Sequence, residues 1–475
     1  MTEKFEKKEI TKKSKDFAKW YNDVILKSEL ADYAPIKGCM VIRPYGYALW
    51  EKIQEFLDKL IKEHGVANAY FPIFIPEKFL KLEKEHVEGF SPLFAVVTIA
   101  GGRQLKEKLI IRPTSETVMY EMYKKWTKSW RDLPLLINQW NNVVRWEKRT
   151  YLFLRTSEFL WQEGHCAHQT HEENMETVLW ALDAYQKTYN ELMAMYGVAG
   201  VKSESEKFAG ALRTYTFEML MPDGKALQGC TSHDLGQNFA KAFNWTVQDK
   251  DGTKLYPWQN SWGLSTRSIG GLIMVHGDDN GLVLPPQMAP IQIVIIPIPG
   301  SRLRVYEYAR GLKSELAKSG FRCLLDEVEG ETAGFKYHKW ELKGVPVRLE
   351  IGREEAEKNI PTAVFRHNSE KKELKIGEIG DLLRKMQNDL FLRHKKFTEE
   401  NTSTVNSYEE FKGIMKTKRG FIKSFWCEDK TCEEKIKEET KASIRCLPLD
   451  TKEEKGKCVY CGKEAIHRWL FAQAY

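Results

Sequence analysis

Hydrophobic residues recur every three or four positions in the early part of the chain, a spacing that predicts amphipathic helices, and alternate elsewhere as in strands. Asp223-Gly224 lies between two alternating runs and predicts a β-hairpin. The expected elements are helices over 47–63 and 172–196, strands over 68–75 and in both arms of 138–165, a hairpin over 212–231, and a glycine-rich segment over 268–281. The first part of the chain therefore predicts antiparallel sheet covered by helices.

After Pro285-Pro286 the pattern changes to alternating strands and helices, which favours a parallel-type sheet. The expected strands are 291–298, 321–325, 345–351 and 362–366, and the expected helices are 304–319, 335–342 and one from Ile379. A polar stretch, 398–407, then leads as a linker into a cysteine-bearing tail. We therefore expect an α/β multidomain protein with domains at 1–289, 290–397 and 398–475.

Composition restricts the class of protein. The longest apolar stretch, 291–299, is far too short to span a bilayer, and the N-terminal residues lack the apolar core of a secretory signal, so a cytoplasmic protein without a membrane partner is expected. A net charge of +7 is compatible with a polyanionic partner without requiring one. Nine unevenly distributed cysteines argue against a disulfide framework.

Charged residues are unusually dense on the strands of 138–165, where Arg145 and Arg155 accompany several glutamates. A planar guanidinium binds phosphate oxygens in pairs and keeps its charge, so two arginines on neighbouring strands suggest an anionic ligand. An arginine–glutamate network on a solvated sheet face has the same composition. The residues alone leave both interpretations open.

Five of the cysteines follow residue 426 and four of them form two short-spaced pairs, Cys427/Cys432 and Cys458/Cys461, with 25 residues between the pairs. Two such pairs are typical of a structural, tetrahedral Zn²⁺ site. Cys446 lies between them and is an alternative ligand, and four reduced thiols without metal are the other interpretation.

Several blocks resemble class II aminoacyl-tRNA synthetases, in the form found in prolyl-tRNA synthetases. Motif 2 is resembled by Arg145-Trp146-Glu147, Phe153-Leu154-Arg155 and Phe159–His165, motif 1 by 46–76 with Pro72 as its proline, motif 3 by Trp262–Arg267, the amino-acid-pocket segments by Arg112–Thr117, Lys207–Gly210 and Gln228–His233, and the anticodon-binding domain by Trp340–Gly352. Leu152 and Arg353 depart from the family pattern. Only 111 residues separate Arg155 from Arg267, which leaves no room for an editing insertion and resembles the archaeal and eukaryotic type.

The resemblance implies a class II antiparallel catalytic core flanked by helices, an α/β anticodon-binding domain and a small α+β zinc domain. It implies a homodimeric, cytoplasmic proline–tRNA ligase that uses ATP with Mg²⁺ to make prolyl adenylate from L-proline and then charges tRNA(Pro). Arg145 is assigned to the α-phosphate, and Arg155 and Arg267 to the distal phosphates, as catalytic residues. The remaining ATP-binding residues are Glu147, Phe159 on the adenine, and Gln228 and Thr231, with Glu218 as a candidate Mg²⁺ ligand.

The same resemblance places a proline pocket and an anticodon contact. The proline-binding set is Thr114, Glu116, Arg145, Trp161, Glu163, Phe208, His233 and Ser261, and the anticodon-binding set is Glu341 and Arg348. Glu116 is expected to meet the secondary ammonium group. Two alternatives remain: a sister class II enzyme for another small amino acid, and a synthetase-like RNA-binding protein without activity.

Overall fold

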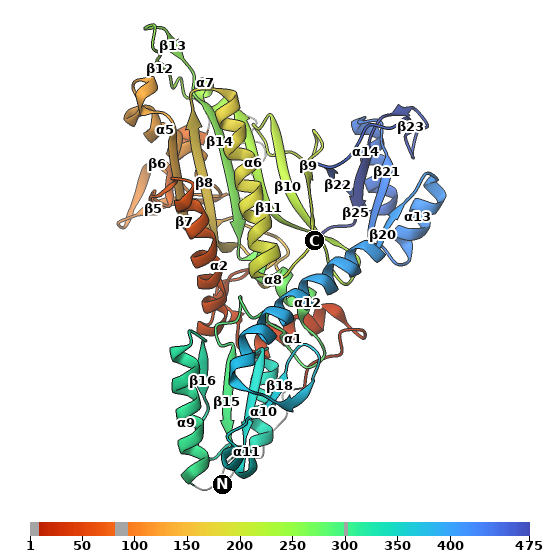
Figure 1. The fold of residues 1–475 in the computed structure, drawn as a ribbon. Helices are drawn as coiled ribbons and strands as arrows, with labels where there is room; N and C mark the ends of the chain where they lie inside the picture. Colours follow the sequence, from red (N-terminus) through yellow and green to blue (C-terminus); the bar gives the residue numbers. More distant parts are fainter. Residues whose placement is uncertain (1–8, 81–93, 299–302) are drawn as a thin grey trace.

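One long sheet dominates the computed structural model, which describes residues 9–80, 94–298 and 303–475. Its strands follow the order β20-β21-β25-β22-β9-β10-β11-β14-β8-β7-β3 (Figure 1). Their bounds are β3 Ala67–Asn68, β7 Leu135–Val144, β8 Glu158–His168, β9 Val198–Val201, β10 Arg213–Leu220, β11 Ala226–Gly236, β14 Trp258–Ser265, β20 Thr402–Thr404, β21 Phe421–Phe425, β22 Ser443–Pro448 and β25 Arg468–Ala472. Within the described ranges, no helix has both the length and the apolarity to cross a bilayer.

The middle of the sheet, from β9 to β7, is antiparallel throughout, as the sequence predicts. Helix α6 (His171–Lys187) packs across β8, β14 and β11 and continues as a π-helical turn, η3 (Thr188–Leu192). It begins at a capping box in which Thr170 and Glu173 satisfy each other's backbone amides. Both α6 and α2 (Pro44–Glu63) bury their apolar stripes in the main core. The two helices expected from periodicity are therefore confirmed.

Shorter elements surround this core. They are α1 Phe17–Lys27, β1 Ala31–Tyr33, β2 Met40–Ile42, β4 Phe74–Pro76, α3 Glu77–Leu80, β5 Ala95–Ala100, β6 Arg103–Ile111, α5 Glu116–Trp126, η2 Trp130–Asp132, α7 Asn238–Ala242, β12 Val247–Gln248, β13 Lys254–Leu255 and α8 Arg267–His276. Strands β4, β6 and β5 form a separate three-stranded sheet. The hairpin predicted around Asp223-Gly224 is confirmed as β10 and β11.

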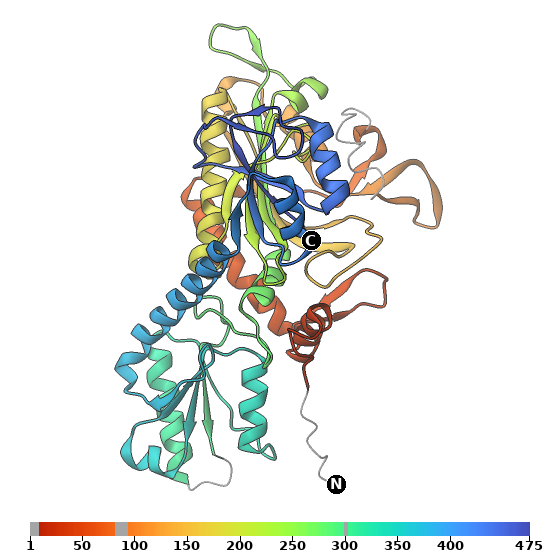
Figure 2. The same ribbon diagram turned by 90° about the vertical axis from the view of Figure 1, so that its right-hand side faces the viewer.

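A second unit contains a five-stranded sheet in the order β16-β15-β17-β18-β19 and has its own apolar core (Figure 2). Strand β15 pairs in parallel with β16 and β17, whereas β18 and β19 are added antiparallel, so the expected parallel pairing holds for only three strands. The bounds are β15 Ile293–Pro297, α9 Leu303–Lys318, β16 Cys323–Leu325, α10 Ala333–Leu342, β17 Val347–Ile351, α11 Arg353–Lys358, β18 Thr362–Phe365, β19 Lys371–Glu373 and η4 Ile376–Glu378.

Helix α12 (Ile379–Glu400) connects this unit to the C-terminal part of the chain, drawn in darker blue in Figure 1. The C-terminal part also contains α13 Tyr408–Lys416, α14 Lys430–Thr440, β23 Gly456–Lys457 and β24 Glu464–Ala465. Strand β22 pairs with β9, with Leu447 opposite Val201 and Pro448 opposite Gly200. The C-terminal strands therefore extend the central sheet.

Two expectations from the sequence are wrong. The single strand expected over 68–75 is two short strands in different sheets, because β3 pairs with β7 and β4 pairs with β6. The polar stretch 398–407 is not a linker: it contains the end of α12 and the edge strand β20, which pairs with β21.

A buried charge cluster joins the central sheet to the C-terminal part. Glu218 on β10 accepts hydrogen bonds from Lys202 Nζ at 2.7 Å and from Arg445 Nε and Nη2 at 3.0 and 2.8 Å. Burial alone would raise the pKa of Glu218, but the two cations lower it to about 2. The contribution of Glu218 to stability is therefore present above about pH 4.5, its ordinary pKa, and is lost as the pH falls toward 2.

We expect Glu218→Ala to destabilise the protein by about 3–5 kcal/mol, because it leaves Lys202 and Arg445 buried without their counter-charge. The denaturant midpoint measures this loss. Asp183→Ala is the matched control, since Asp183 pairs with Lys187 at 2.8 Å but on the exposed face of α6. Equal shifts for the two variants would contradict the importance of the buried cluster.

Candidate active site

Two rows of side chains cross the central sheet and form the floor of a cavity of about 210 Å³. One row follows the pairing of Thr214, His233, Ser261 and His165 on β10, β11, β14 and β8. The adjacent row passes through Thr231, Gly263 and Glu163. Residues two apart on a strand lie on the same face, so both rows point into one cavity. The full lining is Thr114, Glu116, Arg145, Trp161, Glu163, His165, Glu206, Phe208, Thr214, Gln228, Thr231, His233, Ser261, Trp262 and Gly263.

All eight residues of the expected proline-binding set line this cavity. Glycine at position 263 leaves room in the floor, because a Cβ there would lie 3.2 Å from the Gln162 carbonyl oxygen and 3.4 Å from the Trp161 ring. Trp161 Nε1 and Ser261 Oγ are buried and have no hydrogen-bond partner among the described residues. A buried donor without a partner is costly, so this cavity suits a ligand that carries acceptors.

Glu163 is the most heavily hydrogen-bonded acid of the cavity. Its carboxylate accepts from Asn141 Nδ2 at 2.6 Å, Gln139 Nε2 at 3.0 Å and His165 Nε2 at 2.9 Å, and Ser115 contributes its hydroxyl and its backbone amide. Burial alone would raise the pKa of Glu163, but these donors lower it to about 2. Glu163 is thus a fixed negative charge whose hydrogen bonds connect β7 and β8 in the floor of the cavity.

The pKa values of two histidines of the floor shift in opposite directions. Burial opposes charge on His165, but the hydrogen bond to Glu163 raises its pKa above the ordinary value. Burial and the neighbouring charges of His165 and Arg145 lower the pKa of His233 to about 3. The Nδ1 atom of His233 lies 2.9 Å from Thr214 Oγ1, and its ring lies 4.5 Å from that of Phe208. His233 therefore forms a neutral wall of the cavity.

The expected ATP-binding residues divide into two groups. Arg145, Gln228 and Thr231 line the cavity, whereas Glu147, Arg155, Phe159 and Arg267 do not. Arg145 stacks 5.4 Å from the Phe159 ring and 5.4 Å from the Trp161 ring, so it connects the two groups. Burial and the like charge of Arg267 lower the pKa of Arg145 to about 10, which leaves it charged at neutral pH.

The other two arginines lie on the motif 2 loop and after β14. Arg155 pairs with Glu147 at 2.9 Å, and Arg267 Nε donates to the Leu154 carbonyl oxygen at 3.1 Å. Leu152, the departure from the family pattern, is buried, and its carbonyl accepts a hydrogen bond from the Tyr21 hydroxyl at 2.8 Å. The departure is therefore accommodated by packing at the base of the loop.

Glu218, the candidate Mg²⁺ ligand, does not lie in the cavity lining. Both of its carboxylate oxygens are held by the buried cations of the charge cluster, and Thr216 also donates to one of them at 2.9 Å. This geometry does not support the assignment of Glu218 to a metal.

Sequence reasoning missed several residues of the site, notably His165, Glu206 and Thr214. His165 follows Trp161 and Glu163 at two-residue steps along β8, so strand alternation could have placed it on the same face. Thr214 lies on β10 opposite His233, so the pairing of the predicted hairpin could have placed it beside the cavity. Glu206 carried no such signal, because its position depends on how the chain after β9 folds back over the sheet.

The anticodon candidates Glu341 and Arg348 both line a small cavity in the second unit, beside Trp340 and Arg366. Arg348 lies 4.4 Å from the Tyr337 ring and pairs with Glu350 at 2.9 Å. The structure thus brings the two candidates together in one small cavity of the second unit, which has its own five-stranded sheet.

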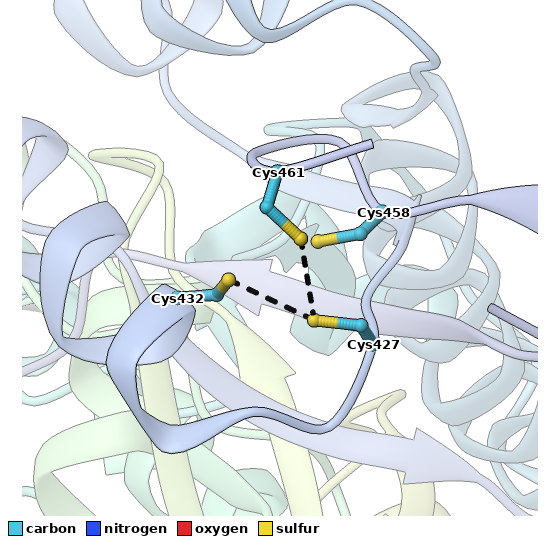
Figure 3. Close-up of side chains that lie close together, drawn as sticks. All are labelled: Cys427, Cys432, Cys458 and Cys461. Carbon is cyan, nitrogen blue, oxygen red and sulfur yellow. Dashed lines mark hydrogen bonds between the residues drawn. The ribbon is translucent and has the colours of Figure 1, made fainter. Parts of the chain in front are cut away.

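The four paired cysteines converge at the start of α14 (Figure 3). The Sγ atoms of Cys427, Cys432, Cys458 and Cys461 all lie within 4.8 Å of one another, and Cys446, buried on β22, is not part of the cluster. Four convergent thiols fit a tetrahedral Zn²⁺ ion, and a site closed by four thiolates has no open position for a substrate.

Three segments of the chain match known protein families. Residues 96–276 match the family described as "tRNA synthetase class II core domain (G, H, P, S and T)", residues 292–386 "Anticodon binding domain" and residues 408–475 "Prolyl-tRNA synthetase, C-terminal". The antiparallel sheet, the arginine-bearing motif 2 strands and these matches are those of a class II aminoacyl-tRNA synthetase.

Relatives that match the chain over almost its full length identify the family within this class. The chain is 53% identical to proline–tRNA ligase 2 of Clostridioides difficile and 52% identical to proline–tRNA ligase of Natranaerobius thermophilus, each over 98% of both chains. A crystal structure of prolyl-tRNA synthetase from Cryptosporidium parvum complexed with halofuginone and AMPPNP has a TM-score of 0.94 and 44% identity, covering 98% of this chain and 99% of that one. A second, complexed with L-proline and AMP, has a TM-score of 0.93 and 42% identity, covering 98% and 96%. The chain belongs to the prolyl-tRNA synthetase family.

We expect the two floor histidines to titrate differently. His165 should have a pKa above 6.5, whereas His233 should stay neutral from about pH 5 to 8. NMR titration of ¹³C-labelled histidines measures both. In Glu163→Gln, burial should dominate and the pKa of His165 should fall below 6.5. An unchanged pKa in that variant would contradict the pairing.

Proposed function

We propose that this cavity activates L-proline with ATP and that the chain then transfers the prolyl group to the 3′ end of tRNA(Pro). The observation that carries the proposal is the convergence of the proline-binding set and Arg145 on one cavity floor. In the first step a carboxylate oxygen of proline attacks the α-phosphorus of ATP, the bond to the bridging oxygen breaks, and pyrophosphate leaves. In the second step a ribose hydroxyl of the tRNA attacks the prolyl carbonyl and releases AMP.

Charge and shape assign the proline end of the cavity. Glu116 lies beside Thr114, whose hydroxyl donates to it, and offers a carboxylate to the secondary ammonium group of proline. Phe208 and neutral His233 supply apolar walls for the ring, with Trp161 on the other side. Glu163, which also lines the cavity, contributes a fixed negative charge.

Arg145 is the residue that connects proline to ATP, because it lines the cavity and also stacks on Phe159. Nucleotidyl transfer depends mainly on positioning and on stabilisation of the charge that develops on the phosphate. We assign Arg145 to the α-phosphate, Arg155 and Arg267 to the distal phosphates, and Phe159 to the adenine. Gln228 and Thr231 are assigned to ribose or phosphate contacts, and Glu147 positions Arg155. Mg²⁺ bound with ATP would neutralise part of the triphosphate charge.

The remaining parts of the chain receive roles in the same scheme. We propose a catalytic domain at 1–289, an anticodon-binding domain at 290–397 that uses Glu341 and Arg348, and a zinc-binding domain at 398–475. The enzyme is proposed to work as a cytoplasmic homodimer, as the motif 1 resemblance of 46–76 implies.

Arg145→Ala should reduce proline-dependent ATP–pyrophosphate exchange by at least about a hundredfold, because a preorganised charge on the reacting phosphate is lost. The exchange assay, run with each of the twenty amino acids, tests the enzyme and its substrate together, and proline should give the highest rate. Arg149→Ala, an exposed arginine on the same loop, is the control and should retain activity. Exchange that is faster with another amino acid, or unaltered in Arg145→Ala, would refute the assignment.

We expect one equivalent of Zn²⁺ per chain, held by Cys427, Cys432, Cys458 and Cys461. Elemental analysis measures the metal. Cys432→Ala should lose the metal and lower the thermal midpoint, since the ion joins two distant segments of the chain. Cys446→Ala should keep the metal, because Cys446 lies outside the cluster. Metal retained in Cys432→Ala but lost in Cys446→Ala would show that the ligand set is wrong.

A further inference from the structure

We propose that helix α14 of the C-terminal part sets the affinity for proline by holding the 203–210 loop, which forms one wall of the cavity. Glu433 and Lys437 are the positioning residues, and neither touches the substrate. The proposal rests on the proposed function and adds a long-range control of the same cavity.

The 203–210 loop is coupled directly to the proline wall. Its residues Glu206 and Phe208 line the cavity. The backbone amide of Phe208 donates to Thr214 Oγ1 at 2.9 Å, and the same oxygen lies 2.9 Å from His233 Nδ1. The Phe208 and His233 rings also stack with 4.5 Å between centroids. A displacement of the loop therefore moves both apolar walls of the cavity.

Glu433 closes the start of this loop from a segment more than 200 positions away in the sequence. Its Oε1 atom accepts from Ser203 Oγ at 3.0 Å, and its Oε2 atom accepts from the hydroxyl of Ser205. The carboxylate is 5% exposed and Ser203 is 1% exposed. The amides of Glu206 and Lys207 both donate to the Ser203 carbonyl oxygen, at 3.1 and 3.0 Å. Glu433 thus binds the side chains of Ser203 and Ser205, the two serines of this tight turn.

A second contact lies one helical turn further along α14. Lys437 Nζ donates to Glu206 Oε1 at 3.0 Å, so residues four apart on one helix face hold positions 203, 205 and 206. We name Glu433, Lys437 and their loop partners the α14 latch. The pair at Lys437 is exposed and weak, whereas the buried contacts at Glu433 carry more of the interaction.

The start of α14 is itself firmly anchored. Asp429 caps the helix by accepting from the Thr431 amide at 2.9 Å and pairs with Lys463 at 3.3 Å. Cys432, the residue before Glu433, belongs to the thiol cluster. A carboxylate at a helix N-terminus would stabilise the helix without a partner, so the two serine hydroxyls are not explained by a local role. They are explained if Glu433 positions the loop.

The test is ATP–pyrophosphate exchange with the full-length enzyme, in which the KM for proline and the KM for ATP are measured separately. Glu433→Ala should raise the KM for proline by about tenfold, because only part of the free energy of the two lost hydrogen bonds is expressed in the position of the cavity wall. The KM for ATP should stay within about twofold, because Arg155, Arg267 and Phe159, which are assigned to the distal phosphates and the adenine, lie outside the cavity lining to which the loop belongs. Variants that merely unfold part of the population would lower the apparent kcat and leave KM unchanged.

Ser205→Ala removes the same contact from the loop side, because it deletes the hydroxyl that donates to Glu433. It is the second variant to be measured if Glu433→Ala folds poorly. Its KM for proline should rise in the same direction, and the double variant should be no worse than Glu433→Ala alone, because both changes break one contact. Glu434→Ala is the matched control: Glu434 is the next residue on α14 and is exposed, with its partner Lys430 at 3.8 Å. It should leave both KM values unchanged.

The outcomes separate this inference from the proposed function. A wild-type enzyme without proline-dependent exchange would refute the proposed function. A wild-type enzyme that is active, together with Glu433→Ala and Ser205→Ala variants whose KM for proline is unchanged, would overturn the α14 latch alone. Fully additive effects in the double variant would also overturn it, because they would show that the two residues act independently.

Discussion

The antiparallel register of β8 with β7 and β14 determines where the charged groups of the cavity floor lie. Glu163 faces Gln139 on one side and Gly263 on the other, and His165 faces Ser261. A shift of one residue in this register would turn Trp161, Glu163 and His165 to the opposite face, where α6 packs. The chemistry of the site therefore depends on the correct pairing of these strands as well as on the identity of its side chains.

The register also explains how unlike charges are kept close together. Glu163, His165 and Arg145 lie within one water-poor cavity, where an unpaired charge would be costly. The carboxylate of Glu163 is satisfied by donors from two strands and a loop, so it remains ionised and raises the pKa of His165. Burial, together with the neighbouring charges of His165 and Arg145, lowers the pKa of His233 and keeps it neutral. The apolar wall and the charged floor of the cavity thus depend on the same few groups.

Much of the fold follows from local patterns, and the failures have physical causes. Alternation predicts β7, β8 and the β10–β11 hairpin because each strand has one buried face. The glycines of 268–281 gave no helical signal, yet α8 contains Gly270, where a Cβ would lie 2.6 Å from Leu154 Cδ2. Strand β20 consists of polar residues and so lacks the apolar alternation that predicts a strand, although its backbone pairs with β21. The motif residues of the cavity were found by resemblance, and Thr214 follows from the pairing of β10 with β11. Glu206 and the α14 latch depend on long-range contacts that no local pattern encodes.

The pairing of β22 with β9 has a consequence for how the protein is made. Strand β9 belongs to the central sheet, but its partner residues, Leu447 and Pro448, follow the whole second unit in the sequence. During synthesis the edge of β9 must wait, with unpaired backbone groups, until those residues have left the ribosome. An uncovered edge strand is a template for pairing with other chains. Between translation of β9 and translation of β22, the nascent enzyme therefore presents an uncovered strand edge that can pair with other chains.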